Sequence, residues 1–334
     1  MINQFIAIHA LPRYRETQFY KAYYQEPIDS FDGLTTWPKD LRQQLAAETL
    51  FSRLEEVKTL ISEHKDVYKT VFSRTDKQQI ETVLMRHGDG RNTVCVSCMV
   101  GCPVKCTFCA TGQMGLRALL SADEIVDQVL HFQRLLKREN QSVTNIVFMG
   151  MGEPMLNLEQ VEQAIDIFTD PGKMAMSDRR VTISTSGYAV QLQQFLSHGF
   201  KGRIAISLHA PTQQLREQLM PVAKLVPLPE LFVVLDEYTK KTNKRITFEY
   251  ILIKGVNDQE LHAKQLVELL KRRFAHVNLI PNNPVAGSLY ERPSNNQVHR
   301  FAEILRQNNI PYTLRVTMGD DIQAACGQLI SSTD

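Results

Sequence analysis

Cys102-Pro-Val-Lys-Cys-Thr-Phe-Cys109 is the most informative stretch of this 334-residue chain, because it places three cysteines in the spacing CxxxCxxC. Three thiolates can bind a metal centre, but they are one ligand short of a closed zinc site or of an ordinary four-cysteine iron–sulfur cluster. The metal centre would then keep an open coordination position for a substrate or a cofactor. The triplet therefore predicts a reactive centre, and a [4Fe–4S] cluster here could pass an electron to the molecule bound at its open iron.

A structural zinc site is the main alternative for the triplet, with a distant histidine such as His87 or His131 as the fourth ligand. Structural zinc usually takes its ligands from two short paired motifs, and the sequence contains no second pair. A disulfide framework fits less well. Residues 1–24 mix charged side chains among apolar ones and do not form a secretory signal, and five of the six cysteines fall within fifteen residues. We therefore expect a cytoplasmic protein with reduced thiols.

Composition sets broad limits on the fold and the partners. With 43% apolar residues, a chain of this length can bury a large core, and it suits one barrel-sized domain plus a small appendage. No window approaches the roughly 18 to 20 continuous apolar residues of a membrane span. The net charge of +2 and the pI near 8.2 are compatible with binding to nucleic acid but do not require it.

From about residue 90 onward, short apolar runs alternate with helix-length amphipathic segments. The clearest helix begins at Ser121, where Ser-Ala-Asp-Glu forms a capping box. Strand–helix alternation predicts a parallel sheet, and about six such units predict an α/β fold, a partial (β/α)6 barrel whose site lies at the carboxyl ends of the strands. The expected strands are 93–97, 145–150, 181–186, 203–208, 245–253, 276–281 and 312–317, and further helices are expected at 158–168, 229–241, 258–273 and 295–308.

The N-terminal part of the chain lacks this alternation. We predict a small, mainly helical accessory domain over residues 1–80 and the barrel, with a C-terminal cysteine segment, over residues 81–334. Pro38 could open a helix in this first part. Trp37 is predicted to be a hydrophobic anchor that seats the domain, and stacking on a nucleic-acid base is the alternative.

Several polar motifs follow predicted strands. Gly150-Met-Gly-Glu-Pro154 comes directly after one strand, so its glycines would let the backbone approach a ligand and Glu153 could bind a cationic or hydroxyl-bearing group. Ser184-Thr-Ser-Gly187 and Ser207-Leu-His209 follow two later strands. Polar strand caps are the alternative for each of them. Cys326 lies far from the other cysteines, beside two alanines, and taken alone it would be a core residue.

Taken together, these motifs resemble those of the radical S-adenosylmethionine (SAM) RNA adenine methyltransferases, the family of RlmN and Cfr, and most closely the RlmN branch. The resemblance runs from about residue 80 to the end of the chain. The motifs that carry it are Cys-Val-Ser-Cys-Met-Val-Gly-Cys, Cys-Thr-Phe-Cys-Ala-Thr-Gly, Gly-Met-Gly-Glu-Pro, Ser-Thr-Ser-Gly, Ser-Leu-His-Ala and Ala-Ala-Cys-Gly-Gln-Leu.

This resemblance implies two cofactors, a [4Fe–4S] cluster and SAM. The cluster would be ligated by Cys102, Cys106 and Cys109. The residues that would contact SAM, carried over motif by motif, are Gly152, Glu153, Ser184, Ser207, Leu208, His209 and Asn283.

The resemblance also implies a mechanism for a carbon that is too electron-poor to attack SAM as a nucleophile. One SAM methylates Cys326, and a second is split reductively to a 5′-deoxyadenosyl radical, which removes hydrogen from the methyl-cysteine. The resulting carbon radical adds to the base. Cys95 then attacks Cys326 to form a disulfide and release the product, while Glu81 removes a proton from the ring carbon. A solvated glutamate on an edge strand is the alternative for Glu81, since the stretch from Glu81 to Cys95 is about one residue longer than in relatives.

The function implied is methylation of C2 of an adenosine in 23S ribosomal RNA, with transfer RNA as a further candidate substrate. The alternatives are C8 methylation of the same nucleotide and, from another class, a non-catalytic zinc-containing RNA-binding protein. Pro154 agrees with the C2 branch, whereas Phe168-Thr-Asp-Pro171 resembles the C8 branch. A low-potential donor such as flavodoxin or ferredoxin would supply electrons, and we expect a monomer that does not bind membranes. Basic segments at Arg179-Arg180 and at 271–273 are candidate RNA contacts, with solvated helix ends as the alternative.

One departure from the family concerns the cysteines. Relatives commonly carry Ser-Gln where this chain has Cys98-Met99, so an extra thiol lies three residues from Cys95. We expect Cys98 to be a small buried side chain, and competition for the disulfide with Cys326 is the alternative.

Overall fold

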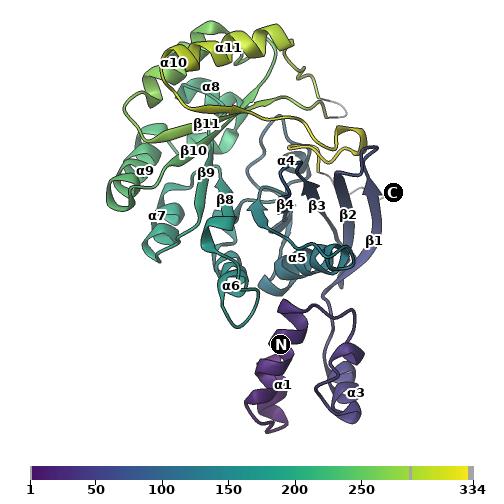
Figure 1. Ribbon diagram of the computed structural model, residues 1–334. Helices are drawn as coiled ribbons and strands as arrows, with labels where there is room; N and C mark the ends of the chain where they lie inside the picture. Colours follow the sequence, from purple (N-terminus) through teal and green to yellow (C-terminus); the bar gives the residue numbers. More distant parts are fainter. Residues whose placement is uncertain (1, 286–287, 330–334) are drawn as a thin grey trace.

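The computed structural model of the chain describes residues 2–285 and 288–329, and its centre is one open ten-stranded sheet (Figure 1). Its strand order is β1-β2-β3-β4-β7-β8-β9-β10-β11-β12. From β4 to β12 all neighbours are parallel. These strands are β4 (Asn92–Cys95), β7 (Asn145–Phe148), β8 (Val181–Thr185), β9 (Arg203–Ser207), β10 (Ile246–Leu252), β11 (Ala275–Pro281) and β12 (Tyr312–Leu314).

Helices connect the parallel strands, and Figure 1 shows α6, α7, α9, α10 and α11 around one side of the curved sheet. The predicted partial barrel is therefore confirmed. The capping box at Ser121 is also confirmed, since its hydroxyl accepts from the Glu124 backbone N–H. The helices of this part are α4 (Ala110–Met114), α5 (Ala122–Lys137), α6 (Leu158–Thr169), α7 (Ala189–Ser197), α8 (Gln213–Leu219), α9 (Leu228–Thr242), α10 (Glu260–Leu270) and α11 (Asn295–Gln307).

The N-terminal part is less helical than the sequence predicts. Helices α1 (Ile2–Ile8), α2 (Tyr14–Tyr20) and α3 (Lys39–Glu48) precede residue 49, together with a π-helical turn at Lys21–Gln25 and a 3-10 turn at Phe31–Gly33. The prediction of a mainly helical domain over residues 1–80 is wrong for its second part, because from residue 54 the chain forms three antiparallel strands that extend the sheet beyond β4. These are β1 (Leu54–Ile61), β2 (Val67–Arg74) and β3 (Gln79–Arg86).

The physical reason for this error lies in how β2 and β3 are buried. Both faces of these strands are covered over most of their length, so the polar–apolar alternation that marks a half-buried strand is missing. The β-branched and aromatic residues of Val-Tyr-Lys-Thr-Val-Phe nevertheless favour a strand.

Trp37 confirms the anchor interpretation. Its side chain is only 2% exposed, and its ring lies 6.2 Å from that of Phe5 and 6.5 Å from that of Phe19. Pro38 is the N-cap of α3, as the sequence suggests. In residues 2–285 and 288–329 no helix has the length and apolar character needed to cross a bilayer.

Candidate active site

The cysteine triplet lies in a loop between two short strands, β5 (Met99–Gly101) and β6 (Leu116–Leu119), which form a small separate sheet. The backbone N–H of Cys102 donates to Gly115 O at 3.0 Å, and Cys109 is the N-cap of α4. Gly101 has φ +74°, and a Cβ there would lie 1.8 Å from Gly115 O. Only glycine fits this close approach, so Gly101 allows the backbone position from which Cys102 follows.

All three cysteines line one cavity of about 150 Å³. Burial raises the pKa of the Cys102 thiol to about 12 and shifts those of Cys106 and Cys109 upward as well. Buried thiols of this kind become thiolates when a metal supplies the compensating positive charge. The cavity is also lined by five of the residues expected to contact SAM, namely Gly152, Glu153, Ser184, Ser207 and His209.

The donor set fits a cluster better than a single ion. Among the residues that the structure describes, no three His, Cys, Asp or Glu side chains are grouped closely enough to hold one metal ion. In a [4Fe–4S] cluster each thiolate binds a different iron, so the three thiols can stand further apart around their common cavity.

Glu153 connects the loop after β7 to the end of β8. Its carboxylate is 3% exposed and accepts four hydrogen bonds, from the backbone N–H groups of Met155 and Ser186 and from the hydroxyls of Thr185 and Ser186. Burial raises the pKa of this carboxyl, and the hydrogen bonds oppose the shift. Four donors occupy the acceptor capacity of a carboxylate. An ammonium group of SAM would therefore take the place of a hydroxyl donor, which can rotate away.

We predict that Glu153→Ala weakens SAM binding roughly ten- to a hundredfold, the value of one charge-assisted contact of about 1.5 to 3 kcal/mol. It should also lower stability, because two backbone N–H groups and two hydroxyls lose their acceptor. Glu153→Gln keeps one acceptor oxygen and is the matched control, with a smaller loss of stability but no carboxylate charge. Titration calorimetry and denaturant unfolding measure the two effects separately. Unchanged SAM affinity in both variants would assign Glu153 a purely structural role.

The strand-end motif Ser207-Leu-His209 contributes two side chains to the cavity. His209 has φ +58°, and its Nδ1 accepts from the backbone N–H of Ile251 at 3.1 Å. Burial lowers the pKa of His209 to about 3, so its ring is neutral at pH 7. The Leu208 side chain is fully buried and is not one of the described residues that line the cavity. Any contact of Leu208 with SAM would therefore be made by its backbone.

Glu249 also lines this cavity, and the sequence analysis missed it. The residue lies on β10, is 6% exposed and accepts from Ser184 Oγ at 2.9 Å. Burial raises the pKa of its carboxyl, and the charge of Arg315 lowers it. A signal was present, since Glu249 is an acidic residue within an apolar strand.

A second cavity of about 330 Å³ adjoins the first and contains the other two predicted catalytic cysteines. Cys95, at the end of β4, and Asn283, after β11, line this second cavity. Cys326 lines both cavities, as does Cys109, a predicted cluster ligand. The fold therefore brings the outlying thiol of Cys326 between the cluster loop and Cys95, across more than 200 residues of sequence.

Hydrogen bonds to α4, the helix that Cys109 caps and that we call the cluster helix, hold the C-terminal segment in place. Gly327 O accepts from the Ala110 N–H at 2.8 Å, and Leu329 O accepts from Thr111 Oγ1 at 2.6 Å. Cys326 is accessible because it faces the cavities, yet protein atoms surround it closely enough that burial raises its pKa. The nearby Arg315 opposes that shift.

Glu81 lies outside both cavities as the described residues define them. It is buried on β3, and its carboxylate forms an ion pair with Lys69 at 3.3 Å. Lys69 in turn donates to Gln323 O, three residues before Cys326. The ion pair is thus connected by a hydrogen bond to the C-terminal segment that contains Cys326.

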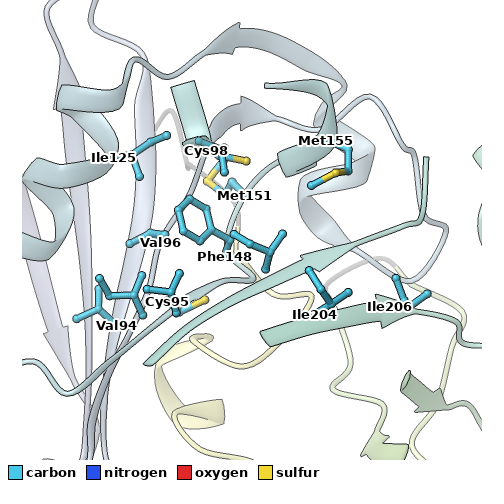
Figure 2. Packing of buried hydrophobic residues seen from close by; sticks show 14 of the residues in the cluster. Val94, Cys95, Val96, Cys98, Ile125, Phe148, Met151, Met155, Ile204 and Ile206 are labelled. Atoms are coloured by element: carbon cyan, nitrogen blue, oxygen red, sulfur yellow. The ribbon is translucent and has the colours of Figure 1, made fainter. Parts of the chain in front are cut away.

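Cys98 confirms the buried interpretation. It is 2% exposed in the apolar core, where Figure 2 shows it near Met151, whereas Cys95 lies beside Val94. A Cβ on Gly152 would come within 2.9 Å of Cys98 Sγ, so this thiol packs beneath the Gly-Met-Gly-Glu loop. Unlike Cys95, it is not among the described residues that line the cavity around Cys326.

Comparisons with known proteins agree with this geometry. Residues 96–267 match the radical SAM superfamily. The chain is 45% identical to a probable dual-specificity RNA methyltransferase RlmN of Symbiobacterium thermophilum, over 95% of this chain and 85% of that protein. It is 40% identical to a ribosomal RNA large subunit methyltransferase N of Nitrosopumilus maritimus, over 95% and 92%. A crystal structure of a radical SAM methyltransferase from Sphaerobacter thermophilus superposes with a TM-score of 0.95 at 42% identity, covering 98% of this chain and 96% of that one.

Proposed function

The chain belongs to the radical SAM superfamily and, within it, to the RlmN-type RNA methyltransferases, and on this premise we propose that it methylates C2 of an adenosine in 23S ribosomal RNA. Transfer RNA is proposed as a second substrate. The observation that carries the proposal is the position of Cys326, which lines both the cavity of the cluster cysteines and the cavity of Cys95.

The cofactors of the family, a [4Fe–4S] cluster and SAM, fit the first cavity. Cys102, Cys106 and Cys109 would hold the cluster, and Glu153 with His209 would hold SAM. When bound, the cluster supplies the reducing electron for radical chemistry at SAM. The protein contributes position and exclusion of water.

We propose that Cys326 carries the one-carbon unit. Its thiolate takes the methyl group of SAM, so an S–C bond forms at Cys326 while the sulfonium S–C bond breaks and S-adenosylhomocysteine leaves. Arg315 favours this thiolate through its charge. After the carbon has been joined to the base, the Cys95 thiolate attacks the Cys326 sulfur. An S–S bond forms, the S–C bond breaks, and its electron pair leaves with the carbon that becomes the methyl group.

Release also needs a base for the proton on the substituted ring carbon. Glu81 is proposed from its motif, and it would have to part from Lys69 to reach the second cavity. Glu249 is the second candidate, since it is a carboxylate that already lines the adjoining cavity. The pH profile of product release in Glu81→Gln and Glu249→Gln distinguishes them, because only loss of the general base removes the acidic limb, on which the rate falls as that base becomes protonated.

The RNA is proposed to enter from the second cavity, whose lining includes His87, Arg91 and Arg315. The N-terminal part, with its helices α1 to α3, is proposed as an accessory RNA-binding unit. Lys271 and Arg273 pair with Glu268 and Asp236, which favours the solvated-helix-end alternative for that basic segment. We further propose a cytoplasmic monomer that receives electrons from flavodoxin or ferredoxin.

We predict that RNA treated with reduced enzyme and SAM gains 2-methyladenosine, measured by mass spectrometry of its nucleosides against both synthetic isomers. Pro154 favours C2, and 8-methyladenosine would instead support the alternative suggested by residues 168–171. Cys326→Ala is the matched control and should give neither. If the active parent enzyme yields no methylated adenosine from ribosomal or transfer RNA, the proposed substrate is wrong.

A further inference from the structure

Arg216 of α8 carries a guanidinium that is fully buried, next to residues that line the first cavity. Its Nη1 donates to Val226 O at 3.2 Å, and its Nη2 donates to Ser186 O at 2.5 Å and to Ser207 O at 3.4 Å. Its Nε has no partner, and within residues 2–285 and 288–329 no carboxylate lies in ion-pair distance. Burying a charge without a paired anion is costly, so this arrangement requires an explanation.

The position of α8 links Arg216 to both halves of the site. Ser186 and Ser207, whose carbonyls it binds, both line the first cavity. At the other end of the helix, Leu219 O accepts from the Thr107 N–H at 2.9 Å, and Thr107 lies between two cluster cysteines. One helix therefore fixes the cluster loop, the end of β8 and the end of β9.

The anionic groups that act on Arg216 belong to the same site. Burial lowers the pKa of Arg216 to about 10, while Cys106, when it is a metal-bound thiolate, and Glu153 act in the opposite direction. That pKa stays well above neutral, so the side chain remains a cation. Neutral amide donors could satisfy the same three carbonyls, so hydrogen bonding alone does not explain why a charge is buried here.

A cluster bound by three thiolates places net negative charge in this buried space, and each added electron increases it. A fixed cation nearby stabilises the more negative form, and net charge and burial are among the factors that set cluster potentials. We propose that Arg216 is a positioning residue with two effects: its charge raises the reduction potential of the cluster held by Cys102, Cys106 and Cys109, and its fork holds the ends of β8 and β9 against SAM. This inference rests on the cluster and is independent of which RNA is methylated.

The test compares the cluster midpoint potential of the reconstituted parent with those of three variants, by anaerobic redox titration without RNA. Arg216→Met removes the charge, and we expect reduction to become at least tenfold less favourable, about 59 mV more negative for a one-electron couple. Arg216→Gln also removes the charge but keeps amide donors, and we expect the same shift. Arg216→Lys keeps the charge and should keep the potential. Arg300→Met, which removes an exposed cation on α11, is the matched control and should leave the potential unchanged.

SAM affinity gives the second readout. Lysine cannot reach the same carbonyls with a planar fork, so Arg216→Lys should bind SAM about tenfold more weakly while its potential stays that of the parent. A potential unchanged in both Met and Gln variants overturns the proposal. If the Met and Gln variants take up no iron and sulfide while Arg216→Lys does, the requirement for a positive charge stands. If none of the three variants takes up iron and sulfide, Arg216 is needed for folding alone. Absence of a cluster in the parent would instead contradict the cofactor assignment.

Discussion

Replacing Cys95 by alanine is expected to trap RNA on the protein through Cys326. Cys326 can still accept the methyl group and be joined to the base, because its own surroundings next to the cluster helix are unchanged. Without Cys95, no thiol in position attacks the Cys326 sulfur, and turnover should fall to background. The adduct should appear as a band that survives denaturation and disappears after nuclease treatment.

The geometry also predicts that Cys98 does not rescue release. Cys98 packs in the core beside Met151, whereas Cys95 lines the cavity that Cys326 also lines. Cys95→Ala and the Cys95→Ala/Cys98→Ala double variant should therefore accumulate equal amounts of adduct, while Cys95→Ala/Cys326→Ala should accumulate none. If the double variant forms no adduct although Cys326 is methylated and the cluster is intact, the covalent mechanism does not apply to this chain.

The parallel half of the fold could be predicted because each strand is a short apolar run next to a helix with a clear apolar face. The seven expected strands and the five expected long helices all lie within a few residues of their observed positions. Helices α7 and α8 were missed. Both are short, with nine and seven residues, and such lengths carry too few turns to show a helical period.

The site residues could be predicted to different extents, depending on whether the sequence next to each residue indicates its role. The spacing of the cluster cysteines and the position of Glu153 just after a predicted strand are local signals, so the sequence could predict both as parts of the site. Cys326 reached the site only through the family resemblance, since nothing near it in sequence indicates that it meets Cys109 and Cys95. Arg216 was not anticipated, because an Arg in an amphipathic helix is ordinarily exposed and only the packing of α8 under the cluster loop buries it.

Glu81 shows the limit of motif transfer. The motif identifies the residue, but the ion pair with Lys69 depends on the pairing of β2 with β3, and β2 lies in the part of the chain that was predicted to be mainly helical. The sequence therefore contained no indication of the partner of this candidate, whose catalytic role stays a prediction. The same antiparallel strands carry Val83 and Met85 into the second cavity, so this part of the sheet belongs to the site.

Alanine at Cys102, Cys106 or Cys109 is expected to abolish both the absorption of the cluster and the reductive cleavage of SAM. Each thiolate binds its own iron, and the three already leave one iron open, so the loss of one more ligand leaves the cluster with only two.

The fold of these variants should survive. Burial raises the pKa of these thiols, that of Cys102 to about 12, so they are neutral without the metal and their removal leaves no buried charge unpaired. Cys98→Ala removes a buried thiol from the same region and is the matched control, which should keep the cluster. Circular dichroism, iron content and 5′-deoxyadenosine formation measure the three outcomes. A triple-alanine variant that folds and still cleaves SAM after reconstitution would show that the cluster is held elsewhere, and the cavity of the three cysteines would lose its assigned function.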